Sequence, residues 1–193
     1  TNCAVNFDFK ALVEAHVASG ADVTIAYNES EIPEGYKNMS GEGGFYYSYG
    51  LDNGRITKIY VNPKEDGKHN LSLNIFVIKR ELLIKIVDVA FARGLRYFER
   101  DVLLNELDKL NVQGYKFEGY VARISGLQSF FEENMKLLDD ANLTALFDVA
   151  PVYTKIRDDN PSRYIAGAVV KNTMAADGCV IEGEVENCVL FRG

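Results

Sequence analysis

The sequence predicts a mixed α/β domain with a mostly parallel sheet, followed by the start of a hexapeptide β-helix. Over residues 1–150, strand-like runs alternate with amphipathic helical runs, as in sheets whose strands are joined by helices. The polar, proline-containing stretch 158–162 then marks a change in composition. We therefore divide the chain into an α/β domain over 1–150, a linker over 151–163 and a first β-helical coil over 164–193.

The first elements form a predicted β-α-β unit. Residues 3–7 are apolar and strand-like, and Asp8 is a good N-cap for an amphipathic helix over 8–19. Residues 23–27 form a second strand, and this order of elements is typical of a mostly parallel sheet. The polar segment 28–44 has little periodicity, so we expect a mobile surface loop there.

The middle of the chain predicts a hairpin, a buried strand and two further helices. The turn signal of the hairpin is Asp52-Asn53-Gly54, which lies between two aromatic and β-branched runs. The expected elements are hairpin strands at 45–49 and 56–61, a strand at 71–78, a helix at 80–91 that ends at Gly94, a helix at 101–110 and a short helical turn at 143–147.

The stretch 114–125 predicts a half-buried strand that leads directly into a helix. Its aromatic and β-branched residues alternate, and the apolar residues after Gly126 recur at helical spacing. Ser125 is the expected N-cap of this helix, and Gln128 completes a capping box. The first-turn amides at such a junction favour anions, and Arg123 adds a fixed positive charge beside them.

The last segment has a period of six residues. Two series of mostly small or aliphatic residues keep this interval and are offset from each other by four positions. They are Val169, Ala175 and Ile181, and Thr173, Cys179 and Val185. The pattern is typical of a hexapeptide β-helix, for which we favour a scaffold or oligomer surface over a ligand site.

Composition limits the class of protein. The 28 acidic and 21 basic residues give a net charge of −7, and without a basic stripe a nucleic-acid partner is not expected. The three cysteines lack metal-ligand spacing and predict reduced cytosolic thiols. No apolar run is long enough to span a membrane. A strand-like run at residues 3–7 without an initiator Met predicts a fragment of a longer protein.

Several collinear motifs carry a family resemblance: Gly119-Tyr120-Val121 through Glu132-Glu133-Asn134-Met135, Pro151-Val152-Tyr153-Thr154, Asp177-Gly178-Cys179-Val180-Ile181-Glu182-Gly183 and Val185-Glu186-Asn187-Cys188-Val189-Leu190-Phe191-Arg192-Gly193. Together they resemble glucose-1-phosphate adenylyltransferase, also called ADP-glucose pyrophosphorylase. The resemblance implies a Rossmann-like nucleotidyltransferase domain, the start of a left-handed β-helix, a cytoplasmic tetramer and a role in glycogen synthesis. The implied reaction converts ATP and glucose 1-phosphate to ADP-glucose and pyrophosphate.

The chain departs from the catalytic members of that family at three positions. Asn2 aligns with the first metal-binding Asp, and Arg123 aligns with the second, in the family's Gly-Tyr-Trp-Arg-Asp-Val-Gly-Thr. Asn62 aligns with the Lys of the family's Glu-Lys-Pro, which grips the sugar phosphate. Magnesium needs anionic oxygen ligands, so an amide weakens such a site and a guanidinium repels the metal.

These losses resemble the regulatory, D-type subunit of the bacterial enzyme, which pairs with a catalytic subunit in a hetero-oligomer. The resemblance therefore implies no catalytic residues and no cofactor for this chain, whereas catalytic members use Mg²⁺. Residues that the resemblance implies for a sugar-phosphate or nucleotide-sugar ligand are Ser72, Gly119, Tyr120, Arg123 and Ser125. Alternatives are an active nucleotidyltransferase with a different metal arrangement, a ligand-free scaffold, and an Arg123 that merely pairs with a neighbouring carboxylate.

Overall fold

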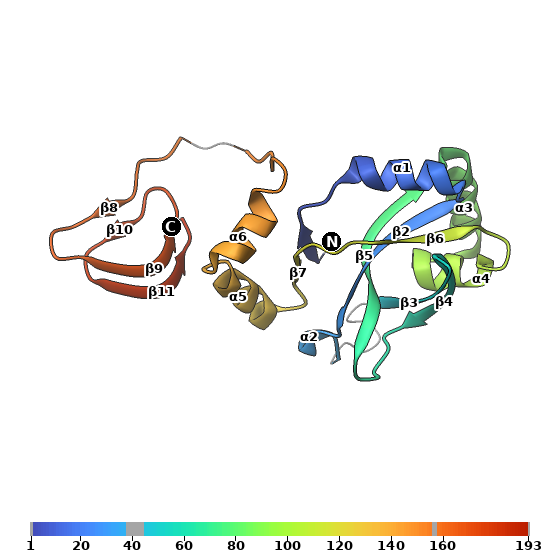
Figure 1. The fold of residues 1–193 in the computed structure, drawn as a ribbon, viewed down its shortest axis with the longest axis horizontal. Helices are drawn as coiled ribbons and strands as arrows, with labels where there is room; N and C mark the ends of the chain where they lie inside the picture. The colour runs from blue at the N-terminus through green and yellow to red at the C-terminus, as the bar shows by residue number, and fades with distance from the viewer. Residues whose placement is uncertain (1, 38–44, 156–157, 193) are drawn as a thin grey trace. The chain divides into compact units, whose positions relative to one another are not determined.

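A computed structural model describes residues 2–37, 45–155 and 158–192 of the chain. The chain forms two units (Figure 1): unit 1 is built from residues 7–118, and unit 2 from residues 2–6 together with the segment from Gly119 onward. The division at Glu118 and Gly119 falls inside the predicted α/β domain. The linker over 151–163 stays a prediction; its residues 156–157 lie outside the described residues, and 151–155 and 158–162 form no helix or strand.

Unit 1 is a closed five-stranded sheet. Its strands are β2 (Val23–Glu31), β3 (Tyr47–Asp52), β4 (Arg55–Val61), β5 (Lys68–Ile78) and β6 (Val112–Lys116). They follow the order β2-β5-β3-β4-β6, and β6 pairs with β2 to close the sheet. All the neighbouring pairs are antiparallel except β2 and β6, so a mixed α/β fold is present but the expected mostly parallel sheet is wrong.

The hairpin between β3 and β4 is confirmed, and its turn explains why. Asn53 and Gly54 have φ values of 48° and 84°. Two consecutive positive φ values are what a tight turn needs to match the twist of its strands, and Asn-Gly adopts them at low cost. The predicted strand at 71–78 is also confirmed as part of β5, which begins three residues earlier at Lys68.

The helices of unit 1 include both confirmed and corrected elements. They are α1 (Phe9–Ser19), α2 (Glu34–Lys37), α3 (Arg80–Arg93), the π-helical turn η2 (Phe98–Leu103) and α4 (Leu104–Glu106). The Asp8 side chain caps α1 by accepting from the Lys10 and Ala11 amides, as predicted. The helix expected at 101–110 is wrong in type and extent, because η2 and the three-residue α4 replace it.

The surface loop expected over 28–44 is wrong for its first part. Strand β2 continues to Glu31, and Tyr36 in α2 is only 1% exposed because it packs with Ile32, Tyr46 and Leu71. The remaining positions of that prediction, 38–44, lie outside the described residues.

The main core of unit 1 fills the closed sheet and is apolar. Val23, Ile25, Ile56, Leu103 and Val112 are fully buried there. At the two ends of the unit, the Phe7 and Phe117 rings stack with centroids 5.1 Å apart. The chain therefore enters and leaves unit 1 at neighbouring points.

Unit 2 contains a short two-stranded ladder, two helices and two pairs of parallel strands. Its elements are β1 (Cys3–Val5), β7 (Val121–Arg123), α5 (Leu127–Lys136), α6 (Asp140–Phe147), β8 (Arg163–Tyr164), β9 (Val169–Ala175), β10 (Val180–Ile181) and β11 (Glu184–Leu190). The single strand expected at 114–125 is wrong, because β6 and β7 are separate and belong to different units. The predicted helix that follows is confirmed as α5.

After residue 162, each strand pairs with the second strand that follows it in the sequence. β8 pairs in parallel with β10, and β9 pairs in parallel with β11, so the chain has coiled once over itself. Asn172 and Asn187 occupy equivalent positions with positive φ, and the Asn172 amide donates to Asn187 Oδ1 at 2.7 Å. The predicted six-residue series does not share one environment, since Ile181 is 4% exposed and Val169 is 40% exposed.

Candidate functional site

The ladder between β1 and β7 brings together two residues that lie 120 positions apart in the sequence. Cys3 pairs with Arg123, and the Ile124 amide donates to the Asn2 carbonyl at 2.7 Å. Cys3 and Arg123 therefore lie on neighbouring strands, with Asn2 directly before the first of them. We call these three residues the β1–β7 site. Two of the three positions at which the sequence departs from the catalytic family members, Asn2 and Arg123, belong to this site.

Arg123 is buried in the β1–β7 site, with 7% of its surface exposed. Its Nη1 donates to Cys3 Sγ at 3.5 Å, and the Cys3 thiol donates to Asn2 Oδ1 at 3.6 Å. Burial raises the pKa of the Cys3 thiol, and the positive charge of Arg123 opposes that rise without cancelling it. The site thus holds a permanent buried cation beside neutral polar groups.

The side chains of the β1–β7 site do not fit a magnesium ion. Mg²⁺ is held by carboxylate oxygens, and here the two positions offer an amide and a guanidinium. Among the residues that the structure describes, no group of three or more His, Cys, Asp or Glu side chains could hold a metal. The expectation that this chain uses no cofactor nevertheless stays a prediction.

Tyr120 lies directly before β7 and bonds to α5. Its hydroxyl donates to Glu133 Oε2 at 2.7 Å, and Lys136 Nζ approaches Glu133 Oε1 at 2.7 Å. Burial raises the pKa of Tyr120, and the neighbouring Glu133 carboxylate raises it further. The predicted ligand residue therefore has a structural bond that fixes α5 to the end of the strand. Gly119, the residue before it, is exposed.

The first turn of α5 is capped differently from the prediction. Gly126 is the N-cap, and the Ser129 hydroxyl accepts from the amides of Ser125 at 2.8 Å and Gly126 at 3.0 Å. Gln128 instead donates to Glu132, one turn further on. Ser125 as N-cap is wrong because the helix begins one residue later, which moves the N3 position from Gln128 to Ser129.

Asn62 and Ser72 belong to unit 1. Asn62 has a φ of 48°, and it exchanges two bonds of 2.9 Å with the backbone of Tyr46. Ser72 is 4% exposed; its hydroxyl accepts from the Asn74 amide at 3.1 Å and also bonds the Glu99 carboxylate. Both residues hold local structure in unit 1, and their role toward a ligand stays a prediction.

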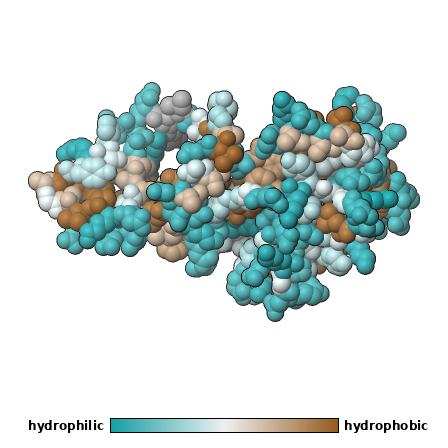
Figure 2. All heavy atoms as spheres, in the orientation of Figure 1, coloured by the Kyte–Doolittle hydropathy of each residue, from teal (hydrophilic) through white to brown (hydrophobic). Residues whose placement is uncertain are grey.

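Sequence reasoning missed one buried polar cluster and one groove. The cluster consists of Tyr49, Ser72 and Glu99 in unit 1, and no local signal in the sequence separates Glu99 from the neighbouring charged residues Arg100 and Asp101. Apolar side chains also reach the surface of the molecule (Figure 2). In unit 2, some of them line a groove of about 800 Å³ between α5 and β11.

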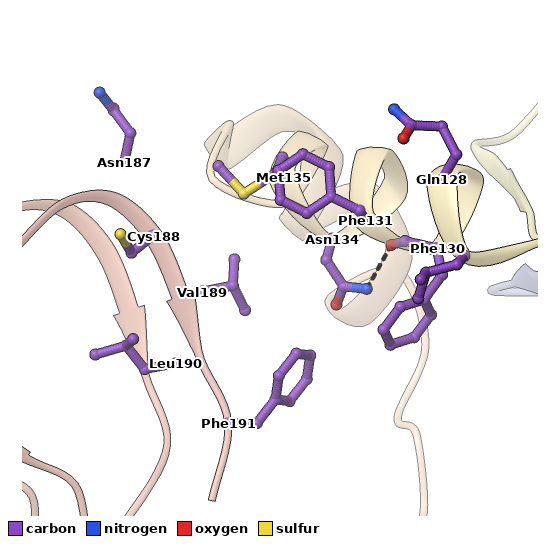
Figure 3. Close-up of a pocket in the computed structure, with 11 residues that line it drawn as sticks. Gln128, Phe130, Phe131, Asn134, Met135, Asn187, Cys188, Val189, Leu190 and Phe191 are labelled. Atoms are coloured by element: carbon purple, nitrogen blue, oxygen red, sulfur yellow. Dashed lines mark hydrogen bonds between the residues drawn. The ribbon is translucent and has the colours of Figure 1, made fainter.

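The groove between α5 and β11 is apolar. Figure 3 shows Phe130 and Phe131 on α5 and Val189 and Phe191 from the other wall. The Phe130 and Phe191 rings stack with centroids 6.2 Å apart. None of the described residues that line it is charged, so it offers no group that would hold a phosphate.

Comparison with known proteins finds similarity to glucose-1-phosphate adenylyltransferases and to a glycogen biosynthesis protein. No family model matches it. The glycogen biosynthesis protein GlgD of Bacillus subtilis is 33% identical over 138 residues, which cover 71% of this chain and 38% of GlgD. The glucose-1-phosphate adenylyltransferase of Geobacillus stearothermophilus is 30% identical over 190 residues, 96% of this chain and 47% of that protein. The Bacillus subtilis glucose-1-phosphate adenylyltransferase is 28% identical over 192 residues, which cover 96% of this chain and 48% of that protein.

The chain thus spans about half the length, or less, of these curated relatives. The alignments with the adenylyltransferases cross both units, whereas the alignment with GlgD covers a smaller part. The resemblance that the motifs carried is confirmed: this chain is a relative of the glucose-1-phosphate adenylyltransferases and of GlgD.

Proposed function

We propose that the protein containing this chain is a regulatory, non-catalytic subunit of glucose-1-phosphate adenylyltransferase. It would act in the cytoplasm, in glycogen biosynthesis, as a hetero-oligomer with a catalytic subunit of the same family. The observation that carries the proposal is the β1–β7 ladder, which pairs the buried Arg123 with Cys3, the residue after Asn2. A metal-dependent transferase needs anionic ligands at such positions, and phosphoryl transfer depends on the ion that they bind.

The relatives support this choice between subunit types. Of the two Bacillus subtilis proteins, GlgD is 33% identical over 138 residues and the adenylyltransferase is 28% identical over 192 residues. The name of GlgD assigns it to glycogen biosynthesis. We further propose that β8 to β11 begin a left-handed β-helix, which the parallel pairing and the Asn172 to Asn187 bond support.

The test of the subunit role uses the natural gene product that contains these residues, and a catalytic partner from the same organism. We expect the protein alone to form no ADP-glucose with Mg²⁺, to co-elute with the partner in size-exclusion chromatography, and to raise the partner's activity. Magnesium-dependent ADP-glucose formation by the protein alone, at a rate comparable to a catalytic subunit, would show that it is an enzyme instead. Failure to bind any catalytic subunit would also refute the proposal.

A second experiment addresses the ligand. We propose that Arg123 holds a sugar phosphate or nucleotide sugar, because a guanidinium binds phosphate oxygens in a bidentate manner. Calorimetric titration with glucose 1-phosphate and with ADP-glucose should show binding that Arg123→Met abolishes. Arg96→Met changes an exposed arginine of unit 1 and should leave binding intact. Equal binding by both variants would assign Arg123 a structural role, and no binding by the unmodified protein would favour a scaffold.

A further inference from the structure

Glu99 is a carboxylic acid buried in the core of unit 1. Only 4% of its surface is exposed, and its two polar neighbours, Tyr49 and Ser72, are 3% and 4% exposed. Tyr49 comes from β3 and belongs to the same apolar core cluster as Leu103. A carboxyl group at such a depth is energetically costly when it is ionised.

Hydroxyl groups from two strands bond this carboxyl group. The Tyr49 hydroxyl donates to Glu99 Oε1, and the Ser72 hydroxyl from β5 bonds the same carboxylate. Both bonds favour the ionised form, yet burial outweighs them and raises the pKa of Glu99 to about 7. Glu99 therefore changes charge close to neutral pH.

No opposite charge compensates Glu99 from the described elements around it. From β3 the titratable neighbours are Tyr47 and Tyr49, while β5 offers Ser72. On its own turn, Arg100 bonds the adjacent Asp101. No charged group is among the causes of the shift in the pKa of Glu99. Of the other packed elements, β4 supplies Ile56 and Ile59 to the core, Lys85 and Arg93 of α3 line a groove with Asp101, and Glu106 of α4 pairs with Lys109.

The backbone around Glu99 is a π-helical turn rather than a regular helix. In η2, the Leu104 amide reaches back to the Glu99 carbonyl, five residues earlier. Such turns are rare and occur often at functional sites, since they displace side chains from their regular helical positions. The change of charge thus falls on a short irregular segment that packs on the closed sheet.

We propose that Tyr49, Glu99 and Ser72 form a pH-sensitive switch, in which protonated Glu99 holds the η2 turn against β3 and β5 and ionised Glu99 weakens that packing. The sign follows from linkage: a buried acid with a raised pKa stabilises the fold below its unfolded pKa and loses that contribution as pH rises. The unfolding equilibrium constant of unit 1 should therefore rise on the order of 100-fold between pH 5 and pH 8 through this group alone.

The test compares the natural protein with Glu99→Gln, which keeps the shape and stays neutral. The variant should match the unmodified protein in stability at pH 5 and exceed it at pH 8, as measured by urea unfolding. Glu81→Gln, at an exposed position on α3, is the matched control and should behave like the unmodified protein. Taking the difference between proteins removes the contribution of His16 and His69, which both retain. Equal destabilisation by Glu99→Gln at both pH values would overturn the proposal.

A second measurement decides the case if Glu99→Gln does not fold. With ¹³C-labelled glutamate, one carboxyl signal should titrate with a midpoint near 7, and hydrogen exchange of residues 98–104 should accelerate above it. Tyr49→Phe removes a donor to the ionised form, so it should move this midpoint upward. Absence of any carboxyl titration between pH 6 and 8, or a midpoint that Tyr49→Phe leaves unchanged, would refute the switch.

Discussion

Replacement of Gly114 by Ala tests how tightly the closed sheet of unit 1 is packed. Gly114 lies on β6 opposite Ile25 of β2, and its amide donates to the Gly54 carbonyl at 2.8 Å. An added Cβ would lie 2.6 Å from Leu51 Cδ2 and 2.9 Å from Tyr27 Cε1. Both distances are shorter than any ordinary contact between carbon atoms.

The size of the effect depends on which neighbour can move. The Leu51 methyl group is the end of a flexible side chain and can rotate away, whereas the Tyr27 ring is 9% exposed and fixed in the core. Overpacking of this kind costs about 1–3 kcal/mol. The lower entropy of the unfolded Ala variant offsets about 0.4–1 kcal/mol of that cost. We therefore expect a net loss of about 1–2 kcal/mol, or roughly 3–6 °C in Tm for a chain of this size.

Urea unfolding and calorimetry should be carried out on Gly114→Ala beside two other variants. Gly50→Ala places its Cβ 3.1 Å from Lys58 Cβ and should cost less. Gly183→Ala meets no atom within 4 Å and should lie within about 0.5 kcal/mol of the unmodified protein. If Gly114→Ala is as stable as Gly183→Ala, the packing of β6 against Tyr27 is looser than the distances indicate.

Three further predictions concern caps, the Tyr120 bond and the Cys3 thiol. Asp8→Ala and Asp139→Ala each remove an N-cap that accepts from two amides, and each should cost about 1 kcal/mol in urea unfolding; Asn at either position should restore most of it. Tyr120→Phe should cost about 1 kcal/mol and remove the phenol that ionises above the ordinary tyrosine range in ultraviolet titration. Arg123→Met should raise the pKa of Cys3 further and slow its reaction with Ellman's reagent at pH 8, so a faster reaction would contradict the assigned contact.

Local signals predicted the elements whose cause is local. Asp8 marks the start of α1 because its side chain can satisfy two amides of the first turn, and this needs no distant residue. Asn53 and Gly54 define their hairpin in the same way. Pairing between strands is different, since β1 and β2 are neighbours in sequence and yet β1 pairs with β7. Nothing in the composition of residues 3–7 distinguishes these two partners.

The candidate site was predictable in part. Family motifs directed attention to Asn2 and Arg123 separately, and the ladder brings Arg123 opposite Cys3, the residue after Asn2. Glu99 could not be recognised, because the burial of a charged residue depends on tertiary packing rather than on its neighbours in sequence. The same holds for Ser129, whose capping role depends on α5 starting after an extended Gly126.

The stacked Phe7 and Phe117 rings have a consequence for the order of folding. In an unfolded chain, bringing β1 to β7 means closing a loop of more than a hundred residues, which costs about 4 kcal/mol in chain entropy. Once unit 1 has folded, the two rings already hold the ends of that loop together. Formation of the β1–β7 ladder then closes only a few residues. We therefore expect the site that contains Arg123 to assemble after unit 1, because folding of unit 1 has already closed the long loop between β1 and β7.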